Sequence, residues 1–243
     1  SSSMSLPANL PAEVRLIWEH LERARLEKVK DNGNIEAEIP RVVKRGFDKV
    51  IARVVRSLPS DKSVDHNETG QRLFDFGRIT DEVLVGRVPR NTSDLKLLRD
   101  EESVHAVVSM SEDWELRDLG WPPGMVCNAG MTWIHLPTPD YSAPRLCDLI
   151  SAVQFILLHT AEKDRCVYVH CNRGRSRSCL VVLCYLIARY GCSSAQALER
   201  VRSARPTMTL GPSFSGFWSN LRRFEEAVAL CHARRSLHAR PGP

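Results

Sequence analysis

Apolar residues along this chain follow two patterns: short continuous runs, and longer stretches with the three-to-four-residue spacing of a helix. The short runs predict buried strands at 78–86, 103–110, 131–135 and 166–169. The longer stretches predict helices at 11–30, 39–58, 92–101, 145–162, 179–187, 193–204 and 213–232. Because strands and helices interleave, the pattern predicts a layered α/β fold class.

Residues 39–58 carry the strongest amphipathic pattern, with Val, Ile and Phe on one face and Arg and Lys on the other. Three interpretations of this helix stay open. Its apolar face packs on the rest of the protein, lies on an anionic membrane surface, or binds a partner. A polar linker follows at 60–70. We therefore expect an N-terminal helical extension at 1–66, a catalytic domain at 72–232 and a basic tail at 233–243.

Composition narrows the class of protein. The 243 residues are 43% hydrophobic and 26% charged, with a formal net charge of +5, as in a soluble globular protein. No apolar run is long enough to span a membrane, and no secretory signal pattern is evident. The eight cysteines lie mostly in apolar stretches without a Cys-x-x-Cys pair, so we expect no metal site and a reducing, intracellular location. The basic residues lack interleaved aromatics, which argues against nucleic acid as a partner.

The segment Val-His-Cys-Asn-Arg-Gly-Arg-Ser-Arg-Ser at 169–178 joins a predicted strand to a predicted helix. Cys171 would lie near the N-terminus of that helix, which favours the thiolate. Gly174 supplies the freedom for a tight curl, and backbone N–H groups between Asn172 and Arg177 would point inward around an oxyanion. Arg177 offers a planar fork to two phosphate oxygens. This cysteine loop (residues 171–177) predicts transfer of a phosphoryl group to sulfur, against the alternative of a buried structural cysteine.

Other residues of the segment add to the expected site. Arg173 and Arg175 widen the positive field around a dianion, and Ser176 completes the expected substrate-binding set. Ser178 places a hydroxyl where it stabilises the departing sulfur. His170 is expected to orient the loop through backbone contacts and not to act as the base.

Breaking a phosphate monoester also requires an acid that protonates the leaving oxygen. The upstream candidates are Asp113, Asp118, Asp140 and Asp148. Asp140 lies in a proline-rich loop after a predicted strand, the place where α/β folds carry catalytic residues. We therefore predict Asp140 as the acid, against the alternative that it only caps the next helix.

The pattern His-Cys, five residues, Arg and Ser resembles the active-site loop of cysteine-dependent protein tyrosine phosphatases, and its Ser-Arg-Ser ending resembles the dual-specificity branch. The resemblance covers about residues 72–230. Segments 74–79, 82–89 and 107–115 are further similar to the mitochondrial, lipid-directed phosphatidylglycerophosphate phosphatases. The resemblance implies a single domain with a mostly parallel sheet flanked by helices, and no cofactor. It also implies that the acidic segment carries Glu112 and Glu115, which help to set the position of Asp140. This sequence departs from that branch at Asn172-Arg173, where the branch has Lys-Ala, which is expected to shift substrate preference.

These observations predict a metal-independent phosphomonoester hydrolase that works through phosphocysteine. The expected substrate is phosphatidylglycerophosphate, with a phosphoinositide next. The alternatives are a dual-specificity protein phosphatase and a non-catalytic phosphate-binding module. We expect a monomer with peripheral membrane contact through 39–58, located in mitochondria or else in the cytoplasm.

Overall fold

The computed structural model describes residues 11–31, 74–122, 124–209 and 216–238. The predicted amphipathic helix 39–58 and the linker 60–70 lie outside the described residues. Among the described helices, none has the length and apolar character needed to cross a bilayer.

A five-stranded sheet forms the centre of the described part, in the order β1 (Phe76–Arg78), β2 (Val83–Arg87), β5 (Cys166–Cys171), β3 (Val104–Ser109), β4 (Thr132–His135). Only β1 runs antiparallel to its neighbour. This confirms the mostly parallel sheet. Strand β5 is central and buried at every residue, which explains its continuous apolar run.

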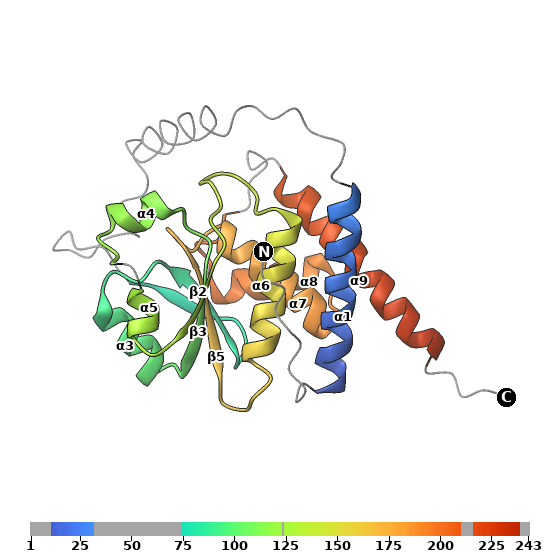
Figure 1. Ribbon diagram of the computed structural model, residues 1–243, viewed down its shortest axis with the longest axis horizontal. Coiled ribbons are helices and arrows are strands. Elements are labelled where there is room, and N and C mark those ends of the chain that lie inside the picture. Colours follow the sequence, from blue (N-terminus) through green and yellow to red (C-terminus); the bar gives the residue numbers. More distant parts are fainter. Residues whose placement is uncertain (1–10, 32–73, 123, 210–215, 239–243) are drawn as a thin grey trace.

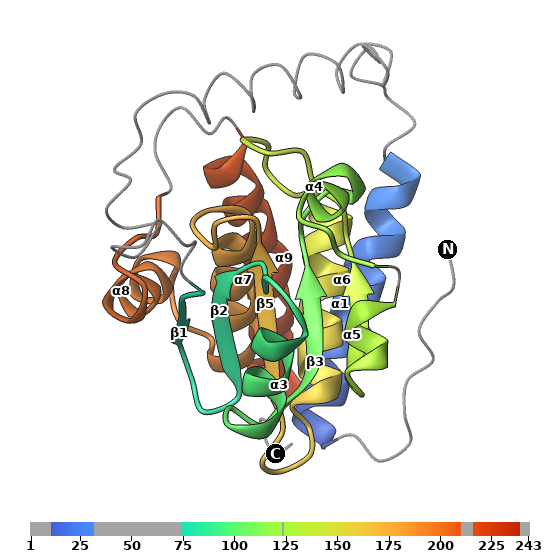
Figure 2. The same ribbon diagram turned by 90° about the vertical axis from the view of Figure 1, so that its left-hand side faces the viewer.

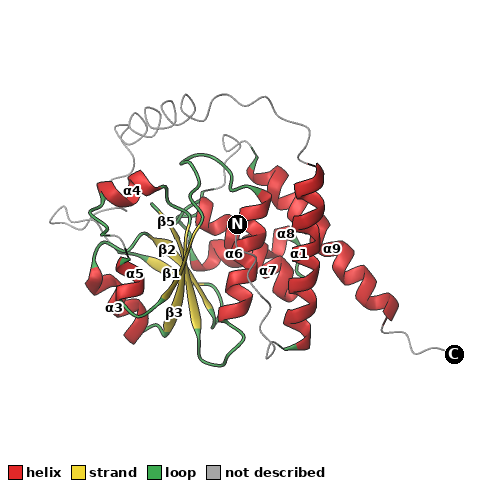
Figure 3. Ribbon diagram, in the orientation of Figure 1, coloured by secondary structure: helices red, strands yellow, loops and turns green. Residues whose placement is uncertain are grey.

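Helices cover both faces of the sheet (Figures 1 and 2). One face carries α3 (Thr92–Asp100), α4 (Asp113–Asp118) and α5 (Met125–Asn128). The other carries α6 (Leu146–His159), α7 (Arg177–Tyr190), α8 (Ser194–Ala204) and α9 (Phe217–His238). Figure 3 shows the two helical layers on either side of the strands. The predicted fold class is therefore confirmed.

Two predicted boundaries are wrong. The stretch 78–86 is two strands, because Thr80 and Asp81 form a turn in which the Ile79 N–H donates to the Val83 carbonyl at 2.9 Å. Helix α9 continues to His238, so the predicted tail at 233–243 begins as helix.

Helix α1 (Ala12–Asp31) belongs to the same core as the catalytic domain. Its residues Val14, Ile17, Trp18 and Leu21 are buried, and the helix packs on α6, α7 and α9. The Nε2 of Gln154 on α6 donates to the Glu22 carboxylate at 3.1 Å. The first helix of the predicted extension is therefore an integral layer of the domain.

The parallel strands bring three connections to one edge of the sheet. The carboxyl end of β5 continues into the cysteine loop, β3 leads into α4, and β4 leads into the segment 136–145, which we call the acid loop. Carboxyl ends of neighbouring parallel strands form the usual ligand-binding edge of α/β folds. The predicted nucleophile, acidic segment and acid consequently meet there.

Candidate active site

The cysteine loop joins β5 to α7 and lies against the end of β2. The N–H of Val88 donates to the Asn172 carbonyl at 3.5 Å. Gly174 has a φ of +64°, and a Cβ on it would lie 2.3 Å from the backbone of Gly86. A side chain at 174 would therefore strain the backbone and collide with β2. The tight curl expected at Gly174 is present.

Cys171 is buried at the start of this loop, 2% exposed, with its Sγ 3.3 Å from the Ser178 Oγ. Burial raises the pKa of the thiol, whereas the positive charge of Arg177 and the hydrogen bond with Ser178 lower it. The net pKa lies below the ordinary value, so a larger fraction of Cys171 is thiolate than in an ordinary cysteine at the same pH.

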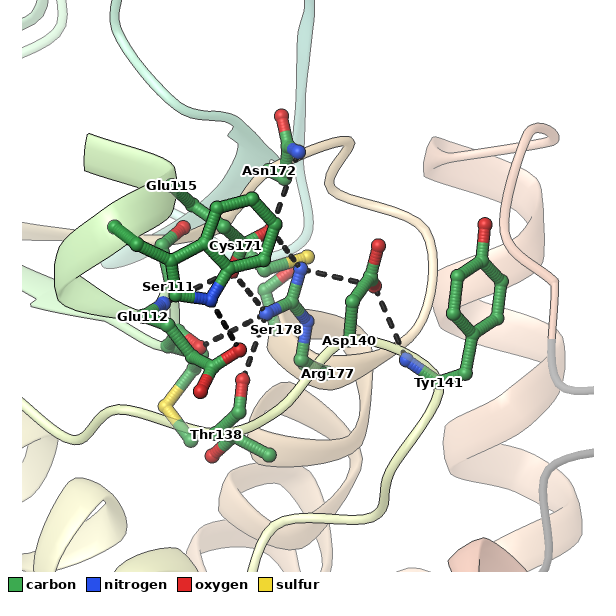
Figure 4. Close-up of polar contacts among 12 residues, drawn as sticks. Ser111, Glu112, Glu115, Thr138, Asp140, Tyr141, Cys171, Asn172, Arg177 and Ser178 are labelled. Carbon is green, nitrogen blue, oxygen red and sulfur yellow. Dashed lines mark hydrogen bonds and ion pairs between the residues drawn. The ribbon is translucent and has the colours of Figure 1, made fainter. Parts of the chain in front are cut away.

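Arg177 is fully buried at the first position of α7, and two carboxylates reach its guanidinium (Figure 4). Its Nη1 lies 2.6 Å from Glu115 Oε2 and its Nη2 lies 2.9 Å from Glu115 Oε1. The same Nη2 lies 3.0 Å from Asp140 Oδ1. The Thr138 carbonyl accepts a further bond from Nη1 at 2.8 Å. Burial disfavours the charge, but Asp140 and Glu115 together raise the pKa of Arg177 above its ordinary value.

Asp140 is brought to the site by the acid loop. Its Oδ1 also accepts the Tyr141 N–H at 3.1 Å, and Tyr141 itself has a positive φ of 62°. The Tyr141 ring points away from Arg177 (Figure 4). Of the other candidate acids, Asp148 pairs with Arg145 and Asp113 lies near His135. Asp140 is the one candidate with a described contact to Arg177.

The acidic segment forms α4 and contacts the cysteine loop. The pKa of Glu115 is lowered, because the raising effect of burial is outweighed by Arg177. Glu115 Oε1 also accepts from Asn172 Nδ2 at 3.1 Å, so the side chain of Asn172 is directed to Glu115. Glu115 and Asp140 meet at Arg177, and Glu112 accepts from Trp114 Nε1 at 2.7 Å. Support of the acid by Glu112 and Glu115 stays a prediction, with Arg177 as the contact between Glu115 and Asp140.

His170 packs its ring near Tyr168 and Trp121, and its carbonyl accepts the Met110 N–H at 2.9 Å. Burial and the nearby His135 lower its pKa to about 3. The ring is therefore neutral near pH 7, and neither ring nitrogen has a hydrogen-bond partner among the described residues. A neutral, buried ring with so low a pKa is poorly suited to act as a base.

Residues 93–227 match the family described as dual specificity phosphatase, catalytic domain. The chain belongs to this family. It is 36% identical over 139 residues to the Mus musculus phosphatidylglycerophosphatase and protein-tyrosine phosphatase 1, covering 57% of this chain and 71% of the mouse protein. It is 37% identical over 141 residues to the Arabidopsis thaliana phosphatidylglycerophosphate phosphatase PTPMT2, covering 57% of this chain and 58% of that protein.

A crystal structure of PTPMT1 resembles this dual specificity phosphatase fold with a TM-score of 0.57 and 32% identity, over 67% of this chain and 99% of PTPMT1. A second structure shows PTPMT1 in complex with PI(5)P, with a TM-score of 0.57, 32% identity and coverage of 66% of this chain and 98% of the other. The chain is therefore a cysteine-dependent phosphatase of the PTPMT1 type.

One residue that contacts the cysteine loop of this phosphatase was missed by sequence reasoning. Arg205, just after α8, is buried and donates from Nε to the Gly174 carbonyl at 2.8 Å. The only available signal was an Arg-Pro pair between two predicted helices, which gives no hint of a contact with the loop. Arg173 and Arg175 are half-buried and Ser176 is buried.

The described cysteines, Cys127, Cys147, Cys166, Cys171, Cys179, Cys184 and Cys192, are free thiols. Within the described residues, no group of three or more His, Cys, Asp or Glu side chains is arranged to hold a metal ion.

Proposed function

We propose that this phosphatase hydrolyses phosphomonoesters through a phosphocysteine at Cys171, with phosphatidylglycerophosphate as the first substrate and a phosphoinositide next. The observation that carries the proposal is the position of Arg177. Its guanidinium lowers the pKa of the Cys171 thiol and lies 3.0 Å from the Asp140 carboxylate. A nucleophile, an anion-binding fork and an acid are thus gathered in one place.

In the first step the Cys171 thiolate attacks phosphorus, so that a P–S bond forms as the ester P–O bond breaks. Loop N–H groups and Arg177 stabilise the charge on the phosphoryl oxygens. The Nε of Arg177 has no hydrogen-bond partner among the described residues and is free to donate to phosphate. The substrate phosphate also needs Nη2, so we expect it to displace the Asp140 carboxylate from Arg177. The released carboxylate takes up a proton from solvent and gives it to the leaving oxygen.

In the second step Asp140 takes a proton from water, which attacks phosphorus as the P–S bond breaks. The sulfur leaves as a thiolate, and the Ser178 hydroxyl at 3.3 Å stabilises it. Inorganic phosphate is released, and Asp140 gives its proton to solvent as the carboxylate pairs again with Arg177, which restores the resting site.

Replacing Asp140 tests this assignment. We expect Asp140→Ala to lower kcat about a hundredfold without weakening substrate binding, because general acid–base catalysis contributes about 10² to 10⁴ and the carboxylate that phosphate must displace from Arg177 is gone. Steady-state kinetics on 4-nitrophenyl phosphate in the presence of EDTA measure both parameters. Cys171→Ser, with no turnover, is the baseline. Full activity of Asp140→Ala would show that another group is the acid, and a need for divalent metal would contradict the whole scheme.

The lipid substrate is supported by the relatives, which are named as phosphatidylglycerophosphate phosphatases, and by the PTPMT1 complex with PI(5)P. Arg173 lies in the cysteine loop, two positions after the nucleophile, and adds positive charge suited to a second anionic group, such as the phosphodiester of these lipids. The name of the mouse relative also includes protein-tyrosine phosphatase, and 60 residues of this chain are 47% identical to the Homo sapiens dual specificity phosphatase 28. Protein substrates are therefore the second candidate.

A direct competition separates the two candidates. Vesicles that contain phosphatidylglycerophosphate and soluble phosphopeptides are offered at equal phosphomonoester concentration, with released phosphate as the readout. We expect a kcat/KM at least tenfold higher on vesicles. A preference for peptides would replace the lipid proposal, and binding of either without turnover would point to the non-catalytic module.

The membrane interpretation of residues 39–58 rests on sequence alone and is tested by vesicle flotation with and without that segment. We expect weaker flotation after deletion on anionic vesicles, and equal flotation would contradict membrane contact. We also propose an intracellular, mitochondrial location, because a catalytic thiolate needs a reducing compartment and the resemblance implies that organelle. Imaging of the tagged chain in cells tests this location.

A further inference from the structure

A loop that turns its N–H groups toward an anion turns its carbonyl groups toward the protein. Buried carbonyl groups need donors there, or the loop loses free energy by holding that shape. The donors to three carbonyls of the cysteine loop come from backbone N–H groups. The Val88 N–H donates to the Asn172 carbonyl at 3.5 Å, the Thr209 N–H to the Arg175 carbonyl at 2.9 Å, and the Leu180 N–H to the Ser176 carbonyl at 2.9 Å.

The two carbonyls at the apex of the loop depend on one charged side chain. Arg205 donates from Nε to the Gly174 carbonyl at 2.8 Å and from Nη2 to the Arg173 carbonyl at 3.3 Å. The Cys179 thiol is a weaker second donor to Gly174, at 3.4 Å. Arg205 is 4% exposed, so water does not readily replace these bonds.

The orientation of Arg205 is fixed from the other side. Its Nη2 also lies 2.7 Å from Asp75 Oδ1, and the N–H of Arg87 donates to the Asp75 carbonyl at 3.1 Å. The end of α8 approaches β1 closely at Gly77, where a Cβ would lie 2.3 Å from the Ala204 carbonyl oxygen. Figure 2 shows α8 beside β1 at this edge. Contacts with the edge of the sheet therefore keep the Arg205 guanidinium oriented toward the cysteine loop.

We propose that Arg205, held by Asp75, is a positioning residue that fixes the carbonyls of Arg173 and Gly174 and so keeps the N–H groups of the cysteine loop aimed at the substrate phosphate. The inference rests on the proposed role of this loop as the phosphate-binding element. Arg205 acts from beneath the loop and has no contact with the reacting atoms.

A planar guanidinium suits this task better than an ammonium group. Its donors diverge in fixed directions, so one side chain reaches two successive carbonyls and a carboxylate at once. Lysine keeps the charge but not this fixed geometry. Arg205→Lys is therefore expected to retain the pair with Asp75 and to lose part of the alignment.

The test compares Arg205→Met and Arg205→Lys with a matched control, Arg200→Met. Arg200 lies in α8 and also donates from Nε to a carbonyl, that of Ile79 at 3.2 Å, away from the loop. Two readouts report loop alignment. They are the inhibition constant of orthovanadate against 4-nitrophenyl phosphate, and the pH of half-maximal Cys171 alkylation by iodoacetamide. The melting temperature reports the fold separately.

We expect Arg205→Met to raise the orthovanadate constant about thirty- to a hundredfold, the size of effect seen when a catalytic group is displaced by about 1 Å. Alkylation of Cys171 shifts to higher pH, because the loop dipoles no longer converge on sulfur. Arg205→Lys falls between Arg205→Met and the unmutated enzyme, and Asp75→Asn shifts both readouts in the same direction by less. Arg200→Met leaves both readouts within twofold.

A purely structural role for Arg205 predicts a different result. Arg205→Met would then melt at lower temperature while both loop readouts stay within twofold of the unmutated enzyme, which would overturn the inference. If Arg205→Met does not fold, Arg205→Lys decides by the same readouts, and unchanged values there overturn the inference as well. Failure of orthovanadate to inhibit the unmutated enzyme would count against the proposed function instead.

Discussion

Two opposing effects act on the sulfur of Cys171. Burial favours the neutral thiol, whereas Arg177 and Ser178 favour the thiolate. The second effect is the larger, so the pKa of Cys171 is lowered. The acid limb of the activity profile is therefore expected to lie at lower pH than the titration of an ordinary thiol, with activity rising as the pH rises through it. The contribution of Ser178 to this lowered pKa can be tested by substitution, because its hydroxyl contacts the sulfur directly.

We expect Ser178→Ala to raise the pKa of Cys171 and to lower kcat about tenfold or more, since a hydrogen bond to a charged group contributes about 1.5–3 kcal/mol. The loss falls on the second step, in which the thiolate departs. Rapid-quench measurement of phosphocysteine checks this, because the intermediate should accumulate in Ser178→Ala. A variant with unchanged alkylation pH and no accumulation would contradict the role of the hydroxyl.

His170 makes stability depend on pH. Its pKa falls from the ordinary 6.5 to about 3 in the fold, so below pH 6.5 the unfolded chain binds a proton that the folded chain does not. Stability present above pH 6.5 is therefore lost as the pH falls toward 3, by up to about 1.4 kcal/mol per pH unit. In His170→Asn this component disappears, and denaturant titrations between pH 7 and 4 should show a flatter dependence. An unchanged slope would mean that His170 is not the group responsible.

Sequence reasoning predicted which side chains meet where those residues are close together in the chain. Cys171, Arg177 and Ser178 lie within one loop and one helix turn, so their spacing alone brings them together. Asp140 followed from its place after a strand. Arg205 was missed because it lies 31 positions from Gly174, and the approach depends on how α8 packs against β1.

At the scale of elements, the start of α9 holds the far end of the acid loop. Asn220 Nδ2 donates to the Pro144 carbonyl at 2.8 Å, and a Cβ on Gly216 would lie 3.4 Å from the Ala143 Cβ. The sequence predicted both elements but not their contact. The acid loop is thus anchored at Arg177 on one side and at α9 on the other.

We expect Asn220→Ala to lower kcat about fivefold with little change in KM, because an ordinary hydrogen bond contributes about 1 kcal/mol to holding the loop that carries Asp140. Ser219→Ala, an exposed neighbour on the same helix, is the matched control. Steady-state kinetics with both variants decide the matter. Equal effects of the two substitutions would show that α9 does not position the acid loop.

At the scale of the whole molecule, the packed core extends beyond the residues that match the dual specificity phosphatase family. The match spans residues 93–227, yet α1 contributes Trp18 and Leu21, which are buried against the same helical layer. The sequence indicated the apolar face of this helix through its spacing. It did not indicate which surface that face covers, because spacing carries no information on the partner.

We expect Trp18→Ala to destabilise the protein by about 3–5 kcal/mol, the usual effect of removing a buried aromatic side chain. Leu16→Ala, on the exposed side of α1, is expected to change stability by less than about 0.5 kcal/mol. Thermal denaturation of the full chain measures both. A loss below 1 kcal/mol in Trp18→Ala would indicate that α1 contributes little to the domain.

The ion pair between Asp140 and Arg177 has a consequence for the end of each catalytic cycle. Once inorganic phosphate has formed, we expect the Asp140 carboxylate to compete with it for the same Nη2, 3.0 Å from Asp140 Oδ1, and so to hasten its departure. We therefore expect turnover to be protected from product inhibition, because this competing carboxylate belongs to the chain and cannot diffuse away. Removing the carboxylate in Asp140→Ala should make free phosphate a markedly stronger inhibitor of the residual activity of that variant.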